Sequence, residues 1–66
     1  MYATQTVIRQ CIEPGMLIMH KGKPWRAAVN ANGKLCISRA MEREQIKVLT
    51  VELIIDRAMN PVKEAS

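Results

Sequence analysis

The placement of proline and glycine constrains this chain more than any other feature. Two turn signals, Pro14-Gly15 and Lys21-Gly22-Lys23, enclose a short apolar run over residues 16–19. Proline presets φ at the second position of a turn, and glycine accepts positive φ at the third. Asn32-Gly33, between two further apolar runs, is the strongest short hairpin signal. The sequence therefore predicts strands over 4–9, 16–20, 25–30 and 34–38.

Residues 39–59 fit more than one structure. Apolar residues alternate over 49–55 as on one face of a strand, yet those at 51, 54, 55 and 58 recur at helical spacing. Thr50 is a suitable N-cap, and Asn60-Pro61 is a stop signal. We expect a strand over 46–50 and a short helix over 51–59. One long helix over 39–59, capped by Ser38, is the alternative.

The length and the aliphatic composition limit the stability of the fold. Sixty-six residues hold one domain, which we place at 1–60 with a flexible tail over 61–66. There is no Phe, one Trp and one Tyr, so the core must be aliphatic. A chain of this size buries only about 60% of its unfolded surface. We therefore expect self-association through surplus apolar residues, namely Val51, Ile54, Ile55 and Met59.

The cysteines and the apolar runs indicate a compartment. The longest apolar run has four residues, far below the about 20 that cross a bilayer. No charged region followed by a long apolar stretch opens the chain, so no signal peptide is predicted. We expect a cytoplasmic protein with no membrane contact. Cys11 and Cys36 are then expected to be reduced and to pack as small buried hydrophobes.

The charges are unevenly distributed along the chain. Residues 1–39 hold six Lys and Arg against one acid, and residues 40–66 hold four against five. A basic half favours an anionic partner, RNA or DNA before a membrane. Cations would contact phosphates, and an exposed indole could stack on a base for about 1–3 kcal/mol. The candidate residues, expected on one rim, are Lys21, Lys23, Trp25, Arg26 and Lys34. Burial of the single tryptophan as the core anchor is the competing interpretation.

Catalytic and metal-binding patterns are not evident in the sequence. His20 is the only histidine. No sequence pattern indicates that it pairs with a cysteine as the base of a nucleophile–base couple. The two cysteines and His20 lack the spacing of a zinc site. No phosphate loop, dinucleotide fingerprint or serine elbow is present. We predict that the protein is not an enzyme and has no metal or cofactor.

One stretch resembles a known family. Residues 12–26, IEPGMLIMHKGKPWR, are similar to the opening of the SH3-like barrel in the N-terminal domain of translation elongation factor P. The resemblance rests on an apolar residue followed by Pro14-Gly15 and on Gly22, Pro24 and Trp25 at the next turn. It implies a small five-stranded barrel of the kind used by ribosome- and RNA-binding proteins. The family's lysine loop, Pro-Gly-Lys-Gly, is replaced here by the tight turn at Asn32-Gly33, so its activity does not carry over.

The sequence therefore predicts a mainly β protein, a small SH3-like barrel of four to five strands with a short C-terminal helix. Hairpins followed by one long helix, 39–59, are the alternative fold. The predicted function is non-enzymatic nucleic-acid binding through the basic rim. A protein-interaction module is the alternative function: an adaptor or inhibitor acting on a host protein complex, as small phage or plasmid accessory proteins do.

Overall fold

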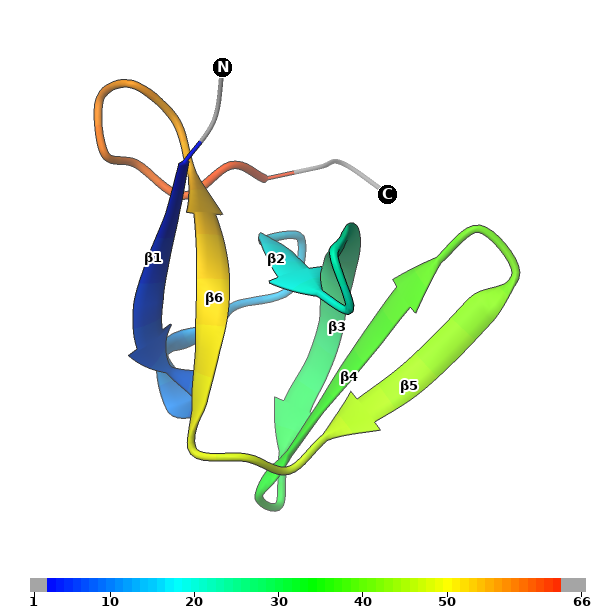
Figure 1. Ribbon diagram of the computed structural model, residues 1–66. Coiled ribbons are helices and arrows are strands. Elements are labelled where there is room, and N and C mark those ends of the chain that lie inside the picture. Colours follow the sequence, from blue (N-terminus) through cyan, green and yellow to red (C-terminus); the bar gives the residue numbers. More distant parts are fainter. Residues whose placement is uncertain (1–2, 64–66) are drawn as a thin grey trace.

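The computed structural model describes residues 3–63 and contains six antiparallel strands (Figure 1). A 3₁₀ turn, η1 (Arg9–Cys11), follows the first strand. The strands pair in the order β1-β6-β2-β3-β4-β5, so the N-terminal strand lies beside the last one. Their bounds are β1 (Ala3–Ile8), β2 (Leu17–His20), β3 (Lys23–Ala31), β4 (Lys34–Arg39), β5 (Glu42–Ile46) and β6 (Thr50–Ile55).

The predicted turns are confirmed by the backbone. Lys21 and Gly22 join β2 to β3 with φ of 55° and 76°, and Asn32 and Gly33 join β3 to β4 with φ of 56° and 75°. Both pairs match the two-residue hairpin turns that need positive φ at both central positions. The strands predicted between these turns are therefore present.

The predicted helices are wrong. Within residues 3–63 the only helical element is η1, so neither the short helix over 51–59 nor the long one over 39–59 forms. A third hairpin turns at Ala40-Met41, and β5 pairs with β4 so that Glu44 faces Ile37. Residues 42–46 are good helix formers in isolation, but cross-strand pairing overrides that propensity. The strand expected over 46–50 is replaced by β5, a loop over 47–49 and β6.

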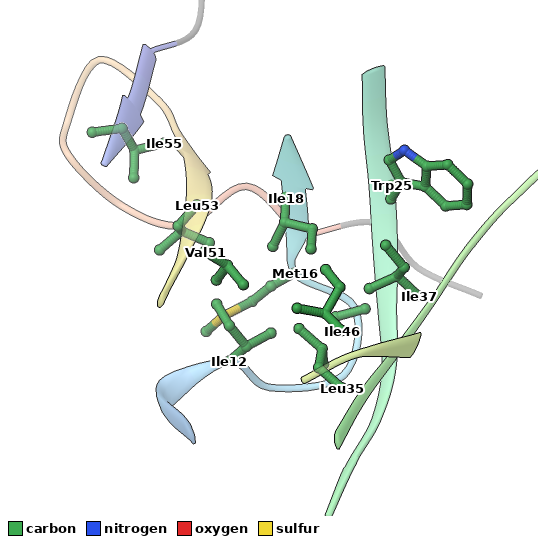
Figure 2. Close-up of a cluster of buried hydrophobic side chains, with 11 residues drawn as sticks. Ile12, Met16, Ile18, Trp25, Leu35, Ile37, Ile46, Val51, Leu53 and Ile55 are labelled. Carbon is green, nitrogen blue, oxygen red and sulfur yellow. The ribbon is translucent and has the colours of Figure 1, made fainter. Parts of the chain in front are cut away.

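The core lies between the two halves of the bent sheet. Side chains from β6 and β2 meet those from β3, β4 and β5 there (Figure 2). Trp25 is 1% exposed, and its indole Nε1 donates a hydrogen bond to the His20 carbonyl at 2.8 Å. The tryptophan is therefore the core anchor. The buried cluster comprises Ile12, Met16, Ile18, Trp25, Ala27, Leu35, Ile37, Ile46, Val51, Leu53 and Ile55.

The chain returns to the sheet after β6. The Asp56 carboxylate accepts hydrogen bonds from the backbone N–H of Ala58 and of Asn60, which closes a turn. The Val62 N–H then donates to the Ile54 carbonyl at 3.0 Å, and the Leu17 N–H donates to the Val62 carbonyl at 2.9 Å. Residues 61–63, predicted to belong to a flexible tail, therefore bond to β6 and β2. Residues 64–66 of that tail lie outside the described residues.

Candidate interaction surfaces

The residues predicted to bind nucleic acid do not share one rim. Lys23 begins β3, whereas Lys34 follows the far end of that strand and pairs with Ala31. A nine-residue strand places its two ends about 25 Å apart. Arg26 lies midway, in the row opposite Leu17 and Ser38. The predicted stacking residue, Trp25, is buried and cannot reach a base.

Lys21 belongs to a charge cluster at one end of β2. Its Nζ lies 2.9 Å from Glu44 Oε2, and His20 Nε2 lies 3.0 Å from Glu44 Oε1. The hydrogen bond from Lys21, and then that with His20, lowers the pKa of the Glu44 carboxyl. The His20 ring also packs edge-on against Trp25, with 5.5 Å between ring centres. The positive charge of Lys21 is thus partly compensated within the protein.

The predicted self-association residues are mostly inside the molecule. Val51 and Ile55 belong to the core cluster, and Ile54 is 5% exposed. Only Met59 reaches solvent, with 65% of its surface exposed. These residues looked like a surplus because a helix would have left part of them outside. Val51, Ile54 and Ile55 of β6 are covered instead, so these three side chains are not available to a partner, whereas Met59 is.

A buried arginine, Arg9, lies at the end of the β1–β6 pair where Ile8 faces Thr50. Arg9 is 7% exposed, and its Nη1 donates to the carbonyl oxygens of Lys47 at 2.9 Å and Val48 at 2.7 Å. The Arg9 N–H donates to the Leu49 carbonyl at 2.8 Å. A buried guanidinium is costly unless it is hydrogen-bonded, so these acceptors hold it in place. Through its side chain and its backbone N–H together, Arg9 bonds the carbonyl oxygens of all three residues of the loop over 47–49.

Asn30 bonds the backbone at both ends of the 3₁₀ turn η1. Its Nδ2 donates to the carbonyl oxygens of Arg9 at 2.8 Å and Ile12 at 2.9 Å. The amide comes from β3, next to the irregularity where the β3–β4 register shifts between Ala27 and Asn30. The loop over 47–49 is therefore connected through Arg9 and η1 to the middle of the sheet. Nothing in the local sequence around residue 9 marks this role.

The anchored loop exposes apolar side chains. Val48 is 62% exposed and Leu49 is 69% exposed, and Ile8, at the end of β1, is 51% exposed. We call these three residues the apolar loop surface. A groove of about 310 Å³ begins beside Val48 and reaches His20, with Met19, Gln45 and Thr50 along it. Sequence reasoning missed Val48 and Leu49, because the expected strand over 46–50 gave them no separate role.

A second groove crosses the outer face of β3, β4 and β5. Arg26, Ser38 and Arg43 occupy one row of the sheet there, since Ser38 is the register partner of both arginines. The groove is lined by these three residues together with Ala28, Cys36, Ile37, Glu44 and Gln45. Neither arginine forms an ion pair with residues 3–63. Arg43 was also missed, because its segment was given a structure only in the alternative long helix over 39–59.

The cysteines are both free thiols. Cys11 is exposed in η1 and Cys36 is half-buried in β4. The expectation that both are buried is wrong for Cys11, because η1 turns it towards solvent. In the part of the chain that the structure describes, no three His, Cys, Asp or Glu side chains come together as metal ligands. No helix among those residues has the length and apolar character needed to span a membrane.

Comparison with known proteins assigns the fold to a family. The family model of the KilR SH3-type barrel domain matches residues 2–54, which span β1 to β5 and nearly all of β6. The chain belongs to the KilR SH3-type barrel family. The SH3-like barrel predicted for it is confirmed, whereas the match gives no support to the closer resemblance to elongation factor P. No curated protein and no solved structure matches this KilR-family chain.

Proposed function

We propose that this KilR-family domain is a protein-interaction module that binds a host protein complex through the apolar loop surface. The observation that carries the proposal is the loop over 47–49, which Arg9 holds while Val48 and Leu49 remain exposed. Membership of a family of phage-type SH3-like domains supports an accessory role of the adaptor or inhibitor kind. A protein partner is the ligand class that buries such side chains most favourably.

The physical argument rests on exposure and on rigidity. Burying a large aliphatic side chain contributes about 1.5–3 kcal/mol, so Val48 and Leu49 represent a large unused contribution to binding. A loop whose carbonyls are already bonded loses little conformational freedom when a partner binds. Lys47 lies beside these side chains, and His20, Gln45 and Thr50 line the adjoining groove, so polar groups flank the apolar contacts as in the rim of an interface.

Nucleic-acid binding remains the competing prediction, with less support than the sequence alone suggested. Trp25 is buried, Lys21 is paired with Glu44, and Lys34 lies far from Lys23. Of the cations predicted to contact phosphate, Lys23, Arg26 and Lys34 form no ion pair with residues 3–63, and Arg43 lies in the same row as Arg26. Their separation favours weak, non-specific attraction over a defined site.

The test is capture of partners from a lysate of the expressing cells, with and without nuclease. The wild-type domain is compared with Val48→Ser/Leu49→Ser, and the control is Val29→Ser/Met41→Ser, which removes exposed apolar side chains elsewhere. We expect the loop variant to lose its retained proteins, the control to keep them, and nuclease to change neither. Retention that disappears with nuclease, or that survives the loop variant, would overturn the proposal.

A further inference from the structure

The two edges of the sheet differ in how they are protected. β1 and β5 are the edge strands. β5 begins with three charged residues, Glu42, Arg43 and Glu44, whereas β1 has the sequence ATQTVI and carries no charge. Natural sheets commonly place charges on exposed edges to prevent pairing with another chain. The β5 edge is protected in this way, and the β1 edge is not.

The register shows which backbone groups of β1 are available. The Arg9 N–H donates to the Leu49 carbonyl at 2.8 Å, one residue beyond the Ile8–Thr50 pair. Bonded and non-bonded positions alternate in an antiparallel pair. Gln5 and Val7 therefore bond to β6, and the N–H and C=O groups of the even-numbered residues point to the open edge. These residues are Thr4, Thr6 and Ile8.

An independent contact supports the same alternation. Ile54, the register partner of Thr4, accepts a hydrogen bond at its carbonyl from the Val62 N–H at 3.0 Å. Residues 61–63 lie between β6 and β2, so the backbone of Ile54 is directed away from β1. Thr4 consequently has no backbone partner on β6. Its N–H and C=O groups face outward, as the alternation requires.

We propose that β1 pairs antiparallel with β1 of a second copy of this chain, which joins the two sheets into one. The pairing is centred on Thr6, so that Thr6 faces Thr6 and Thr4 faces Ile8 of the second copy. These are the positions whose N–H and C=O groups are free, so each facing pair exchanges two hydrogen bonds. This interface leaves Val48 and Leu49 outside the paired edge and shares only Ile8 with the apolar loop surface. The pairing uses the backbone of Ile8, and it does not depend on the proposed function.

The chemistry of β1 favours a second copy as the occupant. A neutral strand with Thr4, Thr6 and Val7 meets itself without like charges, and threonine pairs across strands are favourable. The nearest acid is Glu52, whose carboxylate accepts from the Thr4 and Thr6 hydroxyls. Two Glu52 side chains would lie three strand spacings, about 14 Å, apart, beyond the screening length of about 8 Å. Because the other edge is charged, pairing closes at a dimer and does not continue into a fibre.

Sedimentation equilibrium of the whole chain over a wide concentration range tests the interface. Thr6→Pro removes an outward N–H and no bond to β6, so the fold is expected to persist. Thr6→Val is the matched control, because it loses the hydroxyl but keeps the N–H. We expect a dimer for the wild type and for Thr6→Val, and self-association weakened about tenfold or more in Thr6→Pro. A wild type that stays monomeric, or a dimer that Thr6→Pro leaves intact, would overturn the proposal.

Cross-linking tests the register even where the proline variant fails to fold. With Cys11 and Cys36 replaced by serine, Thr6→Cys places two thiols opposite each other across the proposed axis. Facing residues at bonded positions have Cα atoms about 5.5 Å apart, which a disulfide can span. Gln45→Cys on the β5 edge is the control. We expect oxidation to link Thr6→Cys into a covalent dimer and to leave Gln45→Cys monomeric, and equal linking of the two would contradict the assignment of the edge.

Discussion

The guanidinium of Arg9 donates a hydrogen bond to the carbonyl oxygen of Val48 at 2.7 Å and joins residues 39 positions apart. The same Nη1 reaches the Lys47 carbonyl, and Asn30 bonds the carbonyl of Arg9 itself. This contact therefore links the turn after β1, the middle of the sheet and the loop before β6. It accounts for how a small domain keeps Val48 and Leu49 exposed in a defined position.

Replacing Arg9 is expected to destabilise the fold. Arg9→Ala removes the donor to two carbonyl oxygens and leaves a void beneath the loop. We expect a loss of about 2–3 kcal/mol in the free energy of unfolding, measured by urea denaturation. Lys34→Ala, at the exposed start of β4, is the control and should change it by less than about 0.5 kcal/mol. Equal effects of the two substitutions would show that the Arg9 contacts contribute nothing.

The Asn30 amide is expected to matter through its two donors. Asn30→Asp keeps the shape of the side chain but turns an acceptor towards the carbonyls of Arg9 and Ile12. We expect a loss of about 1–3 kcal/mol, because these carbonyls lose their partner and face a negative charge. Asn32→Asp, in the exposed β3–β4 turn, adds the same charge elsewhere. Thermal unfolding of the two variants separates a specific effect from the general effect of the charge.

The stability of the domain is expected to depend on pH through Glu44. Its pKa is lowered in the folded protein, chiefly by Lys21 and then by His20. A carboxyl whose folded pKa lies below its unfolded pKa contributes stability above the unfolded value and loses it as the pH falls through the folded value. Glu44→Gln should therefore flatten the decline of the melting temperature below the ordinary carboxyl range. Glu42→Gln is the comparison, and an unchanged acid decline in Glu44→Gln would contradict the role of this cluster.

Trp25 is expected to respond to the core and not to nucleic acid. Because the indole is 1% exposed, its emission should be shielded from acrylamide and should not change when single-stranded RNA is added at low salt. Trp25→Phe should cost about 1–3 kcal/mol, since it removes the hydrogen bond to the His20 carbonyl and part of the buried volume. Strong quenching by RNA would show that a base reaches the ring.

The turns follow from local sequence alone. Pro14-Gly15, Lys21-Gly22 and Asn32-Gly33 specify chain reversals because their backbone preferences are local, and Gly15 indeed has φ of 94°. Strands between such turns follow directly. The basic charge of the first half could be counted, but its distribution over the two ends of β3 could not.

The structure of the second half and the composition of the surfaces depend on long-range contacts. The residues of β6 satisfied both helical and strand periodicity, and those of β5 are good helix formers. Pairing with β1 and with β4 made both segments strands. Trp25 could have been a stacking platform or a core anchor until β3 packed against its neighbours. The contact of Arg9 with Val48 joins residues 39 positions apart, so no local sequence pattern could predict it. Backbone preferences at turns depend on two or three neighbouring residues. Side-chain burial and strand pairing depend on residues that are distant in the sequence and meet only in the folded chain.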